Sequence, residues 1–268
     1  MKEIKEMTRE EASSVRYILM DIDDTLTREG KLLPSSFLSL WKLRDAGFKV
    51  IPVTGRPAGW CDLIARQWPV DGVIGENGAL VFWEEESLES GKKLPVLKTF
   101  FHENAVRNDH KTLIKIKEMA LEEIPGLRLA KDQFARLFDI AIDFAEEDPV
   151  FPLTVAERIR EIAEKEGAIA KVSSIHVNIW LGQYTKLSMA EKFLTERFGW
   201  QPENDTEVVF VGDSPNDEPM FGRFPLACAV ANVNKYRDLI KQLPTFIASK
   251  ECGDGFAEIA NKILELRN

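Results

Sequence analysis

The chain has 268 residues, 44% of them hydrophobic and 29% charged, which is typical of a globular protein of one or two domains. A formal net charge of −9 argues against nucleic acid as the main partner, because phosphate backbones bind basic surfaces. The three cysteines form no Cys-x-x-Cys pair, which indicates reduced thiols and no zinc site. With no apolar signal region and no run long enough to span a bilayer, we expect a cytoplasmic protein without membrane association.

The first predicted strand, residues 15–20, stops abruptly at three carboxylates within four positions, Asp21, Asp23 and Asp24. Burying a carboxylate is costly unless a cation or hydrogen bonds compensate its charge. If the strand continued, its two-residue period would place Asp21 and Asp23 on one side. Open α/β sheets bind ligands at the carboxyl ends of their strands, so the run suggests a site. A solvated acidic turn is the alternative for these residues taken alone.

Strands and helices continue to alternate over the first third of the chain. The strand expected at 48–53 ends in Thr54-Gly55-Arg56, where a hydroxyl and backbone N–H groups at a helix start suit an anion. An ordinary turn is the alternative. The other elements expected here are helices at 36–46 and 57–68, short strands at 71–74 and 79–83, and a turn at 76–78.

Between residues 84 and 183 the pattern changes to that of a separate α+β module. The segment 84–93 is charged and indicates a loop. Gln133, Arg136 and Lys131 are candidates for binding a second anionic group, with a solvated basic edge as the alternative. The elements expected after the loop are helices at 103–123 and 154–165 and strands at 137–144, 168–172 and 175–181.

The strand at 175–181 alternates between two kinds of side chain. Its apolar face is formed by Ile175, Val177 and Ile179, and its other face by His176, Asn178 and Trp180. If the apolar face packs on the module's helices, His176 and Asn178 are free to contact a ligand. The same pattern would also suit a plain solvent-facing sheet.

The last third of the chain returns to alternating elements, with helices at 185–198 and 255–266 and strands at 207–211 and 226–230. Lys186 lies near the start of the first of these helices. The strand at 207–211 runs into Gly212-Asp213-Ser214-Pro215-Asn216-Asp217, a second apolar strand that ends in carboxylates. The alternation predicts an α/β fold with a doubly wound, mostly parallel Rossmann-like sheet. We expect a core of residues 1–83 and 184–268, with residues 84–183 inserted as a smaller α+β cap.

These motifs, in this order, resemble those of the haloacid dehalogenase superfamily. Asp21-x-Asp23-x-Thr25 is similar to motif I, Thr54-Gly55-Arg56 to motif II, Lys186 to motif III, and Gly212-Asp213-x-x-Asn216-Asp217 to motif IV. The insertion between motifs II and III resembles the type IIB cap. Cof-like hydrolases, sucrose-phosphate phosphatases and mannosylphosphoglycerate phosphatases share that architecture.

The resemblance implies a nucleophile, an acid–base group and a metal site. Asp21 would attack phosphorus, and Asp23 would protonate the leaving oxygen and then activate water. Mg²⁺ would be the cofactor, because it prefers oxygen ligands. Its ligands would be Asp21, the Asp23 backbone carbonyl and Asp213, with Asp217 holding a metal-bound water or Lys186. The expected phosphate or substrate contacts are Asp24, Thr54, Gly55, Lys186, Asn216, His176 and Asn178, of which Thr54 and Lys186 are also catalytic.

The predicted function is that of a Mg²⁺-dependent phosphatase, a phosphoric monoester hydrolase acting on a small phosphorylated metabolite such as a sugar or polyol phosphate. Asp23 favours phosphoryl transfer, because dehalogenases of the superfamily lack an acid at that position. A phosphomutase is the alternative, since it shares the first half-reaction. A non-catalytic phosphate-binding protein is the remaining alternative, but Asp21, Asp23, Lys186 and Asp213 are all present. No motif fixes the oligomeric state.

Overall fold

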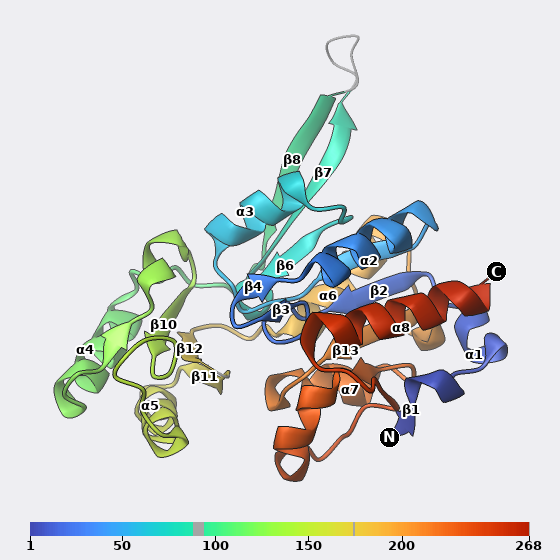
Figure 1. The fold of residues 1–268 in the computed structure, drawn as a ribbon. Helices are drawn as coiled ribbons and strands as arrows, with labels where there is room; N and C mark the ends of the chain where they lie inside the picture. The colour runs from blue at the N-terminus through green and yellow to red at the C-terminus, as the bar shows by residue number, and fades with distance from the viewer. Residues whose placement is uncertain (88–93, 174, 268) are drawn as a thin grey trace.

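The computed structural model describes residues 1–87, 94–173 and 175–267, and its larger domain is built on six parallel strands (Figure 1). The sheet order is β1-β15-β14-β13-β2-β5. The strand bounds are β1 (Lys2–Glu3), β2 (Tyr17–Met20), β5 (Lys49–Pro52), β13 (Val208–Gly212), β14 (Cys228–Ala229) and β15 (Phe246–Ile247). The predicted α/β fold class is confirmed.

Both faces of this sheet are covered by helices, which explains why its central strands β2 and β13 are continuously apolar. In β2, Ile18 and Met20 pack into the core on one face, whereas Tyr17 and Leu19 pack into the core on the other. The first core also contains α1 (Arg9–Ser13), α2 (Pro34–Asp45), α3 (Ala58–Gln67) and α8 (Cys252–Arg267), and the second contains α6 (Lys186–Phe198) and α7 (Glu218–Arg223).

An antiparallel extension continues the sheet beyond β5 through a parallel bridge between Val53 and Ile74. It consists of β6 (Val73–Gly75), β7 (Leu80–Ser87) and β8 (Leu94–Phe101), and β7 and β8 project away from the core as a long hairpin (Figure 1). The expectation of a loop at 84–93 is wrong for 84–87, because these residues pair with β8; residues 88–93 lie outside the described part of the chain. The expected boundary at 83/84 falls within β7.

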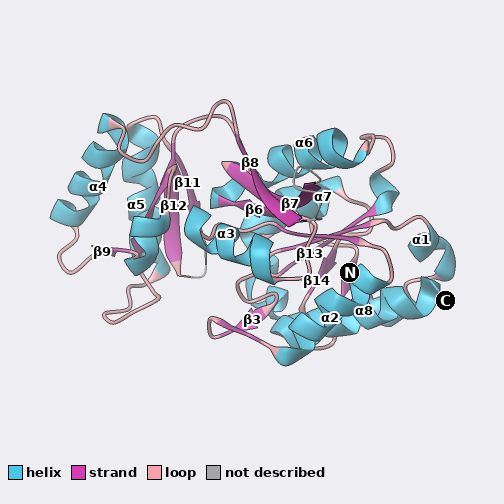
Figure 2. Ribbon diagram, turned by 90° about the horizontal axis from the view of Figure 1, so that it is seen from above, coloured by secondary structure: helices cyan, strands magenta, loops and turns pink. Residues whose placement is uncertain are grey.

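The smaller domain, called the cap below, is an antiparallel sheet with two helices on one face. The sheet order is β11-β12-β10-β9, and α4 and α5 enclose a core that includes Leu113, Ile159 and Val177. Figure 2 shows these helices on the side of the cap sheet turned away from the larger domain. The bounds are α4 (Lys111–Glu123), β9 (Arg128–Leu129), β10 (Asp139–Asp143), α5 (Leu153–Lys165), β11 (Ile169–Val172) and β12 (His176–Trp180).

Helix α4 begins eight residues later than the sequence predicts. His110 caps it by accepting the N–H of Thr112, and Asn108 instead donates to the carbonyls of Arg136 and Asp139. Short polar side chains that bond locally disfavour helix, so the preceding residues form turns. The remaining short pair is β3 (Thr27–Arg28) with β4 (Lys31–Leu32). Among the described residues, no helix is long and apolar enough to cross a membrane.

Candidate active site

Three buried carboxylates meet at the carboxyl edge of the central sheet. Asp21 follows β2 and Asp213 follows the neighbouring strand β13, so their parallel pairing brings both to the same edge. Asp217 ends the 3₁₀ turn η5 (Pro215–Asp217). One oxygen from each carboxylate lies within 4.8 Å of the others. The acidic runs at the ends of two separate strands therefore form one cluster.

Gly212 allows this cluster to form. A Cβ atom at this position would overlap the carboxylate of Asp217. The same carboxylate accepts the backbone N–H groups of Asp213 at 3.1 Å and Ser214 at 3.4 Å. The glycine therefore lets the η5 turn fold back against the strand end and hold Asp217 in place.

Lys186, the first residue of α6, is the cation of the cluster. Its Nζ donates to Asp21 Oδ2 at 2.6 Å and to Asp217 Oδ1 at 3.1 Å. Burial raises the pKa of Asp21 to about 7, although the charge of Lys186 opposes the rise. Burial and repulsion from Asp217 and Asp21 raise the pKa of Asp213 well above its usual range. One ammonium thus faces three buried carboxylates, and negative charge remains uncompensated.

This donor set fits a hard divalent cation. Carboxylate oxygens are the ligands that Mg²⁺ prefers, and a buried excess of negative charge is stabilised by a bound cation. Each carboxylate also accepts hydrogen bonds from the protein. Asp217 accepts from Lys186 and two backbone N–H groups, Asp21 from Lys186 and the N–H of Ile22, and Asp213 from Thr25 and Asn232. The cluster is therefore consistent with a metal site.

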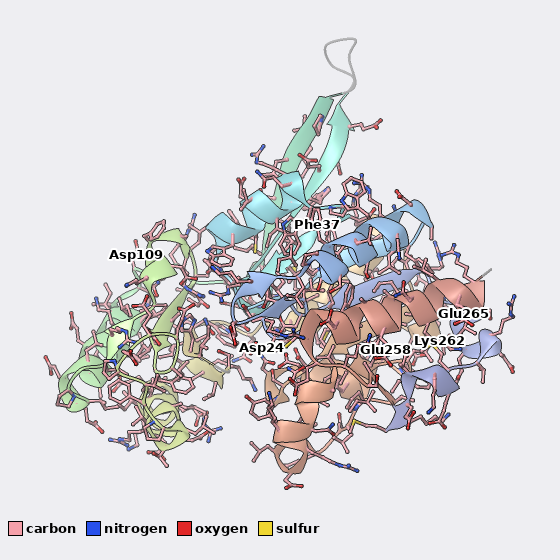
Figure 3. The ribbon with its side chains drawn as sticks, viewed as in Figure 1. Asp24, Phe37, Asp109, Glu258, Lys262 and Glu265 are labelled. Atoms are coloured by element: carbon pink, nitrogen blue, oxygen red, sulfur yellow. The ribbon has the colours of Figure 1, made fainter. Side chains whose placement is uncertain are left out.

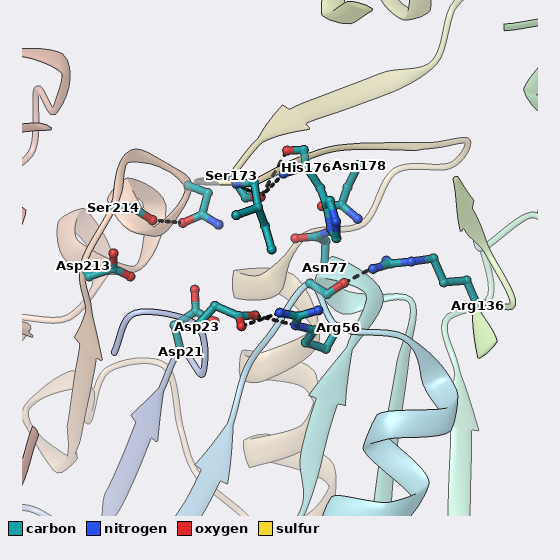
Figure 4. A pocket seen from close by; sticks show the side chains of 13 residues that line it. Asp21, Asp23, Arg56, Asn77, Arg136, Ser173, His176, Asn178, Asp213 and Ser214 are labelled. Carbon is teal, nitrogen blue, oxygen red and sulfur yellow. Dashed lines mark hydrogen bonds and ion pairs between the residues drawn. The ribbon is translucent and has the colours of Figure 1, made fainter. Parts of the chain in front are cut away.

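Asp23 lies on the same pocket as Asp21 but has a different partner (Figure 4). Arg56 donates two hydrogen bonds of 2.8 Å to the Asp23 carboxylate, from Nε to Oδ2 and from Nη2 to Oδ1. Bidentate pairs of this kind fix geometry as well as charge. The side chain of Asp23 is thus directed to Arg56, whereas the expected role of its backbone carbonyl as a metal ligand stays a prediction.

Arg56 is a site residue to which the sequence analysis gave no role. Its side chain is only 6% exposed, stacks on Trp60 with 4.4 Å from Cζ to the ring centre, and reaches Asp132 and Glu146 of the cap at 3.4 and 3.5 Å. Burial works against its charge, but Asp23 and the cap carboxylates raise its pKa. Its place directly after Thr54-Gly55, at the end of a strand, was the signal that could have found it.

Some of the residues predicted to contact phosphate line this pocket, and others are buried behind its wall. Gly55 and Asn216 line it, whereas Thr54 is fully buried and its Oγ1 accepts the N–H of Arg56 at 3.0 Å. The backbone N–H of Asp24 donates to the Thr27 hydroxyl at 3.1 Å. Asp24 lies on the side of the core that faces the cap (Figure 3). Phosphate binding by these groups stays a prediction.

His176 and Asn178 both line the pocket from strand β12, and both are buried. His176 Nε2 lies 2.8 Å from Glu146 Oε2, and this hydrogen bond holds the pKa of Glu146 down at about 2. Asn178 Nδ2 donates to Asp139 Oδ2 at 2.9 Å. The polar face of β12 is therefore not open to solvent, since it is enclosed between cap and core.

The other predictions for β12 hold in part. Val177 and Ile179 pack into the cap core, but Ile175 precedes the strand and lines the pocket. Trp180 does not line this pocket; it is buried and stacks on Tyr184 with 5.7 Å between ring centres.

Glu76 joins the core to the cap through one buried carboxylate. Its Oε1 accepts the N–H groups of Ala58, at the start of α3, and of Leu137, while Oε2 accepts those of Phe138 and Asp139. Burial and repulsion from Asp139 raise its pKa to about 7, against the effect of these N–H donors. The sequence analysis interpreted this residue only as part of a turn.

Arg136 belongs to the same junction. Its side chain is 1% exposed, and its Nη1 donates to the carbonyl of Gly55 at 2.9 Å and to both oxygens of Asp139 at 3.0 Å. Arg136 is thus not part of a solvated basic edge. The side chain of Gln133 bonds to the backbone of β10, and Lys131 is exposed and pairs with Glu147.

Comparison with known proteins agrees with this fold and cluster. The sequence pattern of the haloacid dehalogenase-like hydrolases matches residues 18–107 and 130–259, and the chain belongs to that family, as its motifs predict. Phosphoglycolate phosphatase 1 of Saccharolobus solfataricus is 23% identical over 94% of this chain and 96% of its own length. A glucosyl-3-phosphoglycerate/mannosyl-3-phosphoglycerate phosphatase of Persephonella marina is 26% identical over 92% and 96%. The chain is a phosphatase of the haloacid dehalogenase type.

Solved structures share the whole architecture. A Thermoplasma acidophilum protein superposes with a TM-score of 0.69 and 21% identity, covering 94% of this chain and 99% of the other. A sugar phosphatase of haloacid dehalogenase subclass IIB superposes with a TM-score of 0.62 and 15% identity, covering 94% and 100%. The type IIB arrangement of core and cap is therefore the fold of this chain.

Proposed function

We propose that this chain hydrolyses a small phosphomonoester, a sugar or polyol phosphate, through a phosphorylated Asp21 and with Mg²⁺ as cofactor. The observation that carries the proposal is the pairing of two neighbouring carboxylates with different cations, Asp21 with Lys186 and Asp23 with Arg56. Two carboxylates in different environments suit a nucleophile and an acid–base group. The phosphatases among the relatives support the same reaction class.

Two displacements at phosphorus make up the proposed reaction. In the first, an oxygen of Asp21 attacks phosphorus, the bond to the leaving oxygen breaks, and Asp23 gives that oxygen a proton. In the second, Asp23 takes a proton from the attacking water, the bond from phosphorus to Asp21 breaks, and inorganic phosphate leaves. In the structure, Arg56 holds the Asp23 carboxylate beside the pocket with two hydrogen bonds.

Charge compensation is the main requirement of this chemistry. Lys186 neutralises Asp21 and would bind a phosphoryl oxygen. Asp21, Asp213 and the carbonyl of Asp23 would hold Mg²⁺, which neutralises charge so that a carboxylate can approach a phosphate dianion. We assign the remaining phosphoryl and substrate contacts to Thr54, Gly55, Asp24, Asn216, His176 and Asn178. We also place the enzyme in the cytoplasm, since its three cysteines are buried and unpaired.

The test is phosphate release from a panel of sugar, polyol and nucleotide monophosphates, with Mg²⁺ and with EDTA. We expect inorganic phosphate from one or a few sugar or polyol esters, and loss of release in EDTA that added Mg²⁺ restores. Chromatography of the same reactions separates hydrolysis from isomerisation. An isomeric sugar phosphate in place of inorganic phosphate would overturn the proposal in favour of a phosphomutase.

A further inference from the structure

Asn77 lines the catalytic pocket, and one of its polar atoms has no partner in the protein. Its side chain is only 6% exposed, and its Nδ2 makes no hydrogen bond within the described part of the chain. A buried donor without an acceptor destabilises a folded protein, so an acceptor from outside the chain is expected to satisfy it. That acceptor is an atom of a ligand or a water molecule.

Three other donors around this pocket already have acceptors in the protein. Arg56 and Asn178 each donate to a carboxylate. Lys186 donates to two carboxylates of the buried cluster. The amide of Asn77 differs from these groups, because it can bind a ligand without giving up a hydrogen bond within the protein.

The backbone around Asn77 forms a strained turn that fixes the amide. Glu76, Asn77 and Gly78 have φ angles of 44°, 56° and 108°, so three successive residues are in the left-handed region. The N–H of Asn77 donates to the carbonyl of Thr54 at 3.1 Å, and a Cβ atom on Gly78 would overlap the carbonyl of Thr185. Strain of this kind is concentrated at active sites, where it holds a side chain in a working position.

The amide lies where it would touch a group that enters the pocket. A Cβ atom on Gly55 would be 3.2 Å from Asn77 Oδ1 and 3.3 Å from Nδ2, so the glycine leaves room for the amide. Figure 4 shows Asn77 with Arg56 below it and Asn178 above it. The pocket has a volume of about 30 Å³, against about 10–15 Å³ for one water molecule, so a small group fills it and contacts its walls.

We propose that Asn77 is a catalytic residue whose amide donates a hydrogen bond to a phosphoryl oxygen of the substrate. The proposal rests on the phosphatase function above, and it places the contact on the transferred group. Negative charge spreads over the phosphoryl oxygens during the displacement. A donor that the backbone already holds in place stabilises this charge without reorganisation, and an amide does so without changing its own charge.

Two variants remove the donor and keep the left-handed backbone. Asn77→Asp keeps the shape of the side chain but replaces the NH₂ group with an oxygen, and aspartate tolerates this conformation. Asn77→Gly removes the whole amide, and glycine adopts this conformation freely. The matched controls are Asn204→Asp, at an exposed asparagine, and Glu29→Gly, at an exposed residue with a φ of 50°.

Each protein is assayed with Mg²⁺ on the best sugar phosphate and on p-nitrophenyl phosphate, and inhibition by orthovanadate is measured. Both Asn77 variants should lose about 10²-fold or more in kcat/KM on both esters, because the esters share the phosphoryl group. The inhibition constant of vanadate, which takes the place of that group, should rise by at least about tenfold. Both controls should stay within about twofold.

The melting temperature separates catalysis from structure. That of Asn77→Gly should stay within about 4 °C of the unaltered enzyme, because the lost donor made no bond in the protein. A larger fall would assign Asn77 a structural role and overturn the proposal. Activity within about twofold in both Asn77 variants, which a donor bonded only to water would give, or a loss confined to the sugar ester, would also overturn it. No phosphate release by the unaltered enzyme from any ester would instead refute the proposed function.

Discussion

Asp21 and Asp23 are separated by one residue, yet they face different partners. Asp21 contacts Lys186 in the buried acidic cluster, and Asp23 contacts Arg56 on the pocket wall. Open α/β sheets bind ligands at the carboxyl ends of their strands. The sequence could therefore predict that Asp21, Asp213 and Lys186 belong to the site, because each lies where a βα unit meets that edge of the sheet. It could not predict the partner of Asp23, since that depends on how the loop after β5 turns.

Arg56→Lys should separate the geometry of Asp23 from its charge. Lysine keeps one positive charge but cannot make the two parallel hydrogen bonds of the guanidinium. We expect kcat to fall by about 10²-fold, since misplacing a catalytic group by about 1 Å has effects of that size. Steady-state kinetics on the best substrate give kcat and KM separately.

The control for this variant is Arg66→Lys, because Arg66 lies exposed on α3 and pairs with Asp62 four residues earlier. Its kcat should stay within about twofold of that of the unaltered enzyme. Equal kcat values for Arg56→Lys and the unaltered enzyme would show that the two hydrogen bonds from Arg56 to Asp23 play no part in the reaction.

At the scale of elements, the junction between cap and core depends on one carboxylate and one guanidinium. Glu76 bonds the start of α3 to the residues that lead into β10, and Arg136 bonds β10 to the carbonyl of Gly55. Arg136 looks like a surface residue in the sequence, because its burial is created only when the cap docks on the core. Likewise, Pro95 disfavours a strand at 94–101, and β8 forms because it pairs with β7 along its length.

Glu76→Gln should change how stability depends on pH. The pKa of Glu76 is raised from 4.5 to about 7 in the folded protein, so its contribution is full below about pH 4.5 and is lost as the pH rises through 7. That loss is on the order of 3 kcal/mol at pH 8. Glutamine cannot ionise, so the variant should lose less stability between pH 5 and pH 8.

Thermal or urea unfolding at the two pH values measures this slope. At pH 5 Glu76 lies below its pKa of about 7 and is a neutral carboxylic acid, so the neutral glutamine should change the free energy of unfolding by no more than about 3 kcal/mol. Glu123→Gln is the control, since that side chain is exposed on α4. An unchanged slope in Glu76→Gln would contradict the titration of Glu76 in this range.

At the scale of the molecule, the order of elements along the chain sets the site between two domains. The core supplies the carboxylates, Lys186 and Arg56, and the cap supplies His176, Asn178 and Arg136 (Figures 1 and 4). The fold class, the family and the acidic cluster were predictable, because they follow from strand ends and motif order. The cavity of about 660 Å³ between cap and core was not, because its walls come from segments as distant as α5 and residues 231–239.

The most direct test of the central claim is phosphate release by the unaltered enzyme and by Asp21→Asn, each with Mg²⁺ and with EDTA, on the best ester of the panel. Asparagine keeps the shape of Asp21 but is a poor nucleophile, so release should fall by about 10³-fold or more. The circular dichroism spectrum and melting curve should still show a folded protein. The unaltered enzyme should release phosphate only with Mg²⁺. Release by Asp21→Asn at a rate close to that of the unaltered enzyme would contradict the account.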